Sequence, residues 1–130
     1  MPQTPVIVFV CEHGAAKSII AAIYFNRFAR EKKLNLHAIA RGTHPDPELS
    51  SNTVAGLRED QLTPTELIPT KLTWEDIGMA QRIISFCELP DEYHQKAIVE
   101  QWRDVPAVSE NYGRARDAIL ARLQKLIDDL

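Results

Sequence analysis

Cys11, Lys17 and Ser18 are the residues whose types and spacing most directly suggest chemistry. Cys11 follows the short apolar run of residues 6–10, which is typical of a strand buried on both faces. Residues 12–17 form a short loop, and a helical pattern begins at Ser18. Because the start of a helix carries partial positive charge, this arrangement predicts an anion site and favours the thiolate form of a nearby cysteine.

The loop after Cys11 is predicted to bind an oxyanion through its backbone. Gly14 permits a left-handed turn, and the two alanines that follow leave room for peptide N–H groups to face a tetrahedral oxyanion. Lys17 adds a full charge, and Ser18 can donate a hydrogen bond to the Cys11 sulfur. The predicted oxyanion-binding residues are Glu12, His13, Gly14, Ala15, Ala16 and Lys17. The hypothesis is a thiolate nucleophile beside a phosphate-like oxyanion.

Each of these residues also has a structural interpretation. Free cysteines are often inert core residues, although Cys11 lies at the end of a strand, where ligands bind α/β proteins. Ser18 also suits a helix cap. Glu12 and His13 suit rim positions. His13 is also a candidate base or metal ligand, but no second His or Cys lies at ligand spacing, so no metal site is expected.

Strand and helix patterns alternate along the chain. Strands are expected at 6–10, 34–40, 82–87 and 97–99, and helices at 18–33, 50–60, from 73 and at 109–130. Residues 62–71 are expected to be extended and 89–96 to form a polar connection. Such alternation predicts an α/β fold, with a parallel sheet between helices and with Cys11 at the carboxyl end of a central strand.

The composition is that of one globular domain over residues 1–130. A hydrophobic content of 45% and a charged content of 25% are ordinary for such domains, and the net charge of −3 argues against broad nucleic-acid binding. No apolar stretch has membrane-spanning length. Two cysteines and no signal-peptide pattern suggest a cytoplasmic location. No metal or organic cofactor is implied.

A cysteine, five residues, a basic residue and a serine resemble the phosphate loop of the low-molecular-weight protein tyrosine phosphatases. The thioredoxin-coupled arsenate reductases share that fold. Further segments are similar in the same order, at residues 40–45, 54–59, 82–87 and 102–106. The resemblance implies a three-layer, flavodoxin-like fold with a four-stranded parallel sheet. It is specific for the fold and much less so for the activity.

Two positions depart from the resembled pattern. The family has arginine where this chain has Lys17, and arginine grips two oxyanion oxygens with a planar fork. Losing a transition-state donor of this kind can cost on the order of a hundredfold to a thousandfold in rate. The family's general acid is the Asp of an Asp-Pro pair, which here reads Val105-Pro106. Asp104, one residue earlier, is a candidate acid or a solvated loop carboxylate.

Three functions follow from the resemblance. The leading one is a phosphatase in which Cys11 attacks a phosphate ester. The second is an arsenate reductase, in which Cys87 would resolve Cys11 and a thioredoxin-like reductant would restore the thiols. The structural interpretation of Cys87 is a small buried strand residue. The third is a module that binds phosphate or a phosphoprotein without turnover, since Lys17 and the missing Asp-Pro pair weaken the catalytic pattern.

Overall fold

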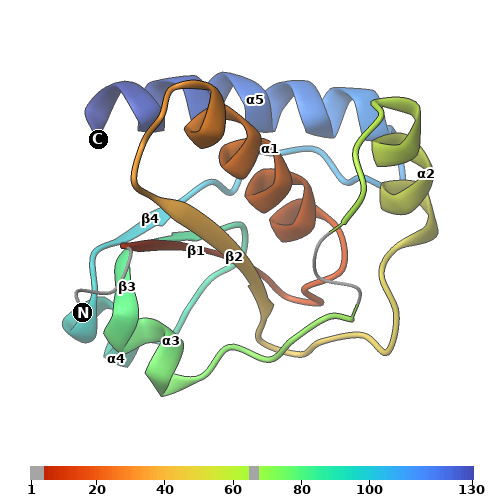
Figure 1. The fold of residues 1–130 in the computed structure, drawn as a ribbon. Coiled ribbons are helices and arrows are strands. Elements are labelled where there is room, and N and C mark those ends of the chain that lie inside the picture. The colour runs from red at the N-terminus through yellow and green to blue at the C-terminus, as the bar shows by residue number, and fades with distance from the viewer. Residues whose placement is uncertain (1–4, 65–67) are drawn as a thin grey trace.

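The fold is a four-stranded parallel sheet between two layers of helices, seen in a computed structural model that describes residues 5–64 and 68–130 (Figure 1). The strands are β1 (Val6–Cys11), β2 (His37–Gly42), β3 (Ala80–Ser85) and β4 (Val99–Gln101), in the order β2-β1-β3-β4. The helices are α1 (Lys17–Glu31), α2 (Ser51–Glu59), α3 (Trp74–Met79), α4 (Asp91–Lys96) and α5 (Tyr112–Asp129). The predicted α/β fold is confirmed.

Strand β1 is the centre of the sheet. All six of its residues are buried, as expected of a run that is apolar on both faces. It pairs with β2 on one side and β3 on the other, and Cys11 lies opposite Gly42 in the β2 register. The chain runs from β1 to β2 on one side and then returns past β1 to β3 on the other, so the strand order reverses beside β1. Cys11 is therefore at the carboxyl end of a strand beside a topological switch point, where ligands bind α/β proteins.

The two helical layers cover opposite faces of the sheet. Helices α1, α2 and α5 lie together on one face, and α3 and α4 lie on the other (Figure 1). On the face covered by α1, α2 and α5, the Phe9 ring packs against two other rings. Its centroid lies 6.0 Å from that of Phe25 and 5.9 Å from that of Trp102. Helix α5 packs here through an apolar stripe of residues spaced three or four apart, Ala115, Ile119, Leu123 and Leu126. None of the described helices has the length and hydropathy needed to cross a membrane.

Two helix starts follow from local capping chemistry. The Ser50 side chain accepts a hydrogen bond from the Thr53 amide and caps α2. Thr73 and Asp76 bind each other's backbone amides in a capping box at the start of α3. Both caps supply hydrogen-bond acceptors to amides that a helix cannot satisfy internally.

The structure corrects several predicted boundaries. Residues 91–96 of the expected polar connection form α4, which Pro90 precedes and whose first turn carries two acidic residues. Strand β3 ends at Ser85, so Cys87 lies beyond it rather than at its end. The Ser85 hydroxyl accepts from the Cys87 amide and donates to the Cys87 carbonyl oxygen, directly after the end of β3. Part of the predicted extended segment, residues 65–67, lies outside the described residues.

Candidate active site

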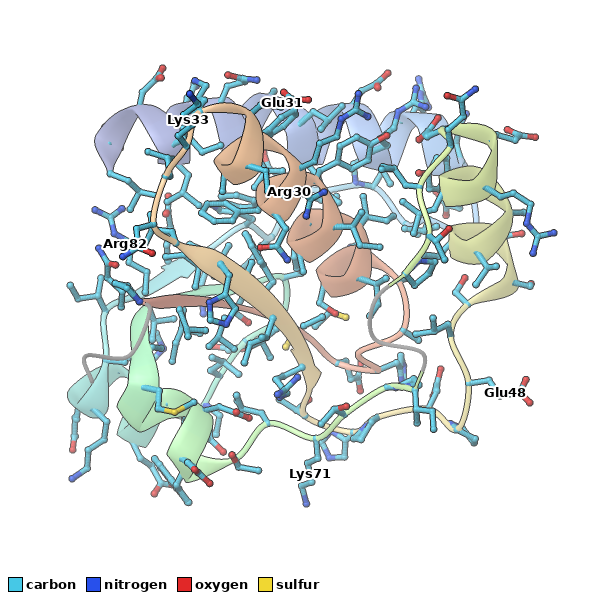
Figure 2. All side chains as sticks on the ribbon, viewed as in Figure 1. Arg30, Glu31, Lys33, Glu48, Lys71 and Arg82 are labelled. Atoms are coloured by element: carbon cyan, nitrogen blue, oxygen red, sulfur yellow. The ribbon has the colours of Figure 1, made fainter. Side chains whose placement is uncertain are left out.

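A pocket of about 310 Å³ opens at the carboxyl end of β1. Cys11 and most of the loop that follows it form one wall. Asp46, Ser50 and residues 86–87 and 107–109 form the rest of the lining. The switch point of the sheet and the predicted anion loop therefore share one cavity. Figure 2 shows that other charged side chains, including Glu48 and Lys71, project away from the body of the protein.

The Cys11 sulfur lies 3.1 Å from the Ser18 hydroxyl oxygen, and both side chains are buried. Helix α1 begins at Lys17 after Ala16, with no side-chain cap. The interpretation of Ser18 as a helix cap is therefore wrong, because the hydroxyl faces the thiol from within the first turn. A hydroxyl that donates to a thiolate stabilises its charge, as a nucleophilic cysteine requires.

The loop carbonyl groups are turned towards the segment after β2. The carbonyl oxygens of Cys11, Glu12, His13 and Ala15 accept from the amides of Thr43, His44, Asp46 and Ser50, at distances of 2.7–3.3 Å. Within residues 5–64 and 68–130, the amides of residues 13–16 have no hydrogen-bond acceptor. Successive amides without an acceptor form a concave set of hydrogen-bond donors that suits an anion.

Two glycines bring this loop against the end of β2. Gly14 has a φ of +60°, which is the left-handed conformation expected from the sequence. A Cβ atom on Gly42 would lie 2.7 Å from the Gly14 nitrogen, so only glycine fits there without a shift of backbone. The shape of the anion loop is therefore set by contact with the neighbouring strand as well as by its own sequence.

The Lys17 ammonium reaches the chain segment that precedes α5. Its Nζ donates to the Val105 carbonyl oxygen at 3.0 Å, across 88 positions of sequence. An ammonium has three donor hydrogens, so this bond leaves others for an oxyanion. Lys17 therefore joins the loop to the segment before α5.

The structure places Asp104 outside the pocket. Its carboxylate pairs with Arg122 of α5, and its side chain is 72% exposed. The hydrogen bond from Arg122 holds the pKa of Asp104 below its ordinary value, which favours the charged form over a proton donor. Asp104 is thus not brought together with the other predicted site residues.

Cys87 and Asp46 are two further polar residues that line the pocket. Cys87 is half-buried, and burial raises the pKa of its thiol, with the nearby Cys11 and Glu12 adding to the effect. Asp46 was not predicted as a site residue, yet its Oδ1 lies 3.2 Å from the His13 Nδ1. Its place in a Pro-rich loop after a strand was the available signal. No group of three or more His, Cys, Asp and Glu side chains in the described parts of the chain could hold a metal ion.

Comparison with solved structures finds the same fold in two classes of enzyme. YfkJ from Bacillus subtilis has a TM-score of 0.84 at 16% identity, with 98% of this chain and 95% of that one covered. A low-molecular-weight phosphotyrosine phosphatase from Vibrio cholerae has a TM-score of 0.79 at 19% identity, with 96% and 95% covered. The chain has the low-molecular-weight phosphatase fold.

A thioredoxin-dependent arsenate reductase from Corynebacterium glutamicum is also similar, with a TM-score of 0.72 at 18% identity. The alignment covers 97% of this chain and 61% of that protein. No protein-family model and no curated protein matches the sequence. At these identities the likeness concerns the fold, so the activity must be argued from the residues of the pocket.

Proposed function

We propose that this protein is a cysteine-dependent phosphatase of the low-molecular-weight type that acts on phosphate monoesters. The observation that carries the proposal is the buried Cys11 sulfur, 3.1 Å from the Ser18 hydroxyl, beside four loop amides that lack acceptors in the described structure. A nucleophile and a set of oxyanion donors in one cavity are the two parts that phosphoryl transfer to sulfur needs. A phosphoprotein is the proposed substrate class.

The proposed reaction has two displacements at phosphorus. The Cys11 thiolate attacks the phosphorus, an S–P bond forms, and the bond to the ester oxygen breaks with its electron pair on that oxygen. The amides of residues 13–16 and the Lys17 ammonium hold the remaining phosphate oxygens. Water then attacks the phosphorus, the S–P bond breaks, and phosphate leaves with the thiolate restored.

The test is hydrolysis of 4-nitrophenyl phosphate by the wild-type protein and by Cys11→Ser. We expect the variant to lose turnover down to the uncatalysed background, because a serine hydroxyl at this position is a far weaker nucleophile. Cys87→Ala is the matched cysteine variant and is expected to keep ester hydrolysis within a few-fold. Full turnover by Cys11→Ser would overturn the proposal.

A second experiment, read together with ester hydrolysis, separates a binding module from an enzyme. Alkylation of Cys11 is measured with and without vanadate, an oxyanion that resembles the transferring phosphate. Protection by vanadate together with ester turnover supports the phosphatase. Protection without turnover by the wild-type protein would instead support a module that binds phosphate or a phosphoprotein.

Arsenate reduction is a second candidate, because Cys87 lines the same pocket as Cys11. Cys11 would attack arsenate and displace its hydroxyl as water. The Cys87 sulfur would then attack the Cys11 sulfur, forming a disulfide and leaving the arsenic as arsenite with the electron pair of the S–As bond. A thioredoxin-like dithiol would reduce the disulfide. In this case Cys87→Ala abolishes arsenate reduction and spares ester hydrolysis.

A further inference from the structure

We propose that His13, oriented by Asp46, is the residue that donates the proton to the leaving oxygen of the substrate. This inference rests on the proposed phosphatase function and supplies the acid that the sequence pattern lacks. The two residues lie 33 positions apart in the chain, and both line the pocket that contains Cys11. The imidazole is a suitable acid, since histidine exchanges its proton near neutral pH.

The imidazole ring lies between two carboxylates. Its Nδ1 is 3.2 Å from the Asp46 Oδ1, which is hydrogen-bond distance, and its Nε2 is 3.7 Å from the Glu12 Oε2, which is beyond it. We therefore assign the Nδ1 proton to the bond with Asp46. The Nε2 proton is left without a tight acceptor and can be transferred. A carboxylate that fixes the ring and the tautomer of a catalytic histidine is a recurrent device in acid–base catalysis.

The depths of Cys11 and His13 in the pocket match their proposed roles. Cys11 is buried, whereas the His13 side chain is 57% exposed. In phosphoryl transfer the attacking and leaving atoms lie roughly in line on opposite sides of phosphorus. A phosphate that binds with one face on the Cys11 sulfur therefore directs its leaving oxygen towards the mouth of the pocket. His13, in the loop wall and largely exposed, is the histidine at that mouth.

The other acids that the sequence offers are poorly placed. Asp104 is paired with Arg122 outside the pocket. His44 does not line the pocket either, and its Nδ1 lies 3.2 Å from the Thr43 hydroxyl oxygen. Besides Asp46 and Glu12, the titratable groups that share the pocket with His13 are Cys11, Lys17 and Cys87. Cys11 is the nucleophile, and Lys17 binds the Val105 carbonyl.

The proton balance of the reaction then closes within the pocket. As the P–O bond breaks, the electron pair passes to the ester oxygen, which takes the Nε2 proton of the His13 imidazolium and leaves as a neutral alcohol. The neutral imidazole next accepts a proton from the water that attacks the phosphorus, and the S–P bond breaks with its electron pair on the sulfur. Phosphate departs and the imidazolium is restored. Asp46 acts as a positioning residue throughout, because its carboxylate holds Nδ1.

Leaving-group dependence tests this role. Phenyl phosphate releases phenol, which holds its proton as tightly as tyrosine does, with a pKa of about 10, so its departure needs an acid. 4-Nitrophenyl phosphate releases a much weaker base that departs with little help. We expect His13→Gln to lower kcat/KM for phenyl phosphate by about a hundredfold or more, and to change kcat/KM for 4-nitrophenyl phosphate by only a few-fold. The comparison uses kcat/KM because this constant covers the steps up to release of the alcohol, whereas the later attack of water is common to both esters.

Asp46→Asn is expected to show the same selective loss to a smaller extent, together with a shift in the pH profile of kcat for phenyl phosphate. His44→Gln is the matched control, because it removes a neighbouring histidine that lies outside the pocket. Addition of imidazole to His13→Ala should restore part of the phenyl phosphate activity, which a merely structural histidine would not allow.

The outcomes separate the two proposals. An equal loss of kcat/KM on both esters in His13→Gln, or a selective loss in Asp104→Asn instead, would overturn the role of His13 while leaving the phosphatase intact. A wild-type protein that hydrolyses neither ester overturns the phosphatase, and the role of His13 with it. A selective loss in His13→Gln with full activity in His44→Gln supports both.

Discussion

At the scale of single residues, Lys17 stands where the resemblance to the phosphatase loop leads us to expect an arginine. Its ammonium binds the Val105 carbonyl at 3.0 Å and remains able to donate to an oxyanion. An arginine has five donors in a rigid fork, so it can hold a carbonyl and two phosphate oxygens at once. The transition state spreads charge over three equatorial oxygens, where a fork is better matched than a point charge.

Lys17→Arg is therefore expected to raise kcat/KM for 4-nitrophenyl phosphate by about tenfold, which corresponds to about 1.4 kcal/mol of extra transition-state stabilisation. Lys71→Arg is the matched control, since that side chain points away from the protein (Figure 2). Steady-state kinetics of both variants measure the effect. A Lys17→Arg variant with reduced kcat/KM would show that the bond to Val105, rather than the charge on the oxyanion, is what Lys17 contributes.

At the scale of elements, the end of β2 shapes the anion loop. Gly42 and Gly14 approach so closely that a Cβ on Gly42 would be 2.7 Å from the Gly14 nitrogen and 2.9 Å from its Cα. The amides of the residues after β2 also bind the loop carbonyls. A change at this contact is transmitted to the donor amides of residues 13–16, because backbone rather than a flexible side chain must move.

Gly42→Ala is expected to destabilise the protein by about 1–3 kcal/mol through overpacking and to weaken vanadate protection of Cys11. Urea unfolding and the alkylation assay measure the two effects. Gly78→Ala is the control, because a Cβ there meets no atom of the described structure within 4 Å. In the helix α3, this alanine should leave stability equal or about 0.5 kcal/mol higher. Equal behaviour of the two variants would contradict the argument.

At the scale of the whole molecule, Asp60 joins three helices. Its Oδ2 accepts from the hydroxyls of Tyr24 in α1 and Tyr112 in α5, at 2.6 and 2.8 Å. Its Oδ1 accepts from Arg116 of α5 at 2.9 Å, while Asp60 itself caps the end of α2. Loss of this carboxylate would leave several donors unsatisfied at the junction of α1, α2 and α5, the three helices that cover one face of the sheet.

The Asp60 cluster also predicts a dependence of stability on pH. Burial raises the pKa of Asp60, but the hydrogen bonds from Tyr24, Tyr112 and Arg116 outweigh it and hold the pKa below 3.8. A lowered folded pKa means that this stability is present above about pH 3.8 and is lost as pH falls through the folded value. Burial, followed by the Asp60 hydrogen bond, raises the pKa of Tyr24 to about 12. The stability that the protonated Tyr24 hydroxyl contributes is present below pH 10 and is lost as pH rises towards 12.

Asp60→Asn is therefore expected to lower the free energy of unfolding at pH 7 by about 2–3 kcal/mol, since it weakens three hydrogen bonds to one carboxylate. The loss relative to the wild type should shrink as pH falls below 4. Urea unfolding from pH 3 to 8 measures both, with the exposed carboxylate variant Asp128→Asn as control. A difference that does not change with pH would show that the charge of Asp60 contributes nothing.

The amino-acid sequence by itself determined the features that depend on near neighbours in the chain. The buried run of β1, the left-handed turn at Gly14, the capping box of Thr73 and Asp76 and the apolar stripe of α5 all follow from spacing and residue type. Each involves residues within one element or its adjoining loop, where backbone geometry limits the possible contacts. The order of these elements then predicted the parallel sheet and the position of Cys11.

Only the tertiary structure decided which distant residues share the pocket. Lys17 binds a carbonyl 88 positions away, His13 meets Asp46 across two loops, and Asp104 pairs with Arg122 rather than with the site. These contacts depend on how loops from separate strands pack at the edge of the sheet, and residue type places no tight limit on that packing. A carboxylate in a loop has the same sequence signal whether it faces a nucleophile or an arginine on a neighbouring helix.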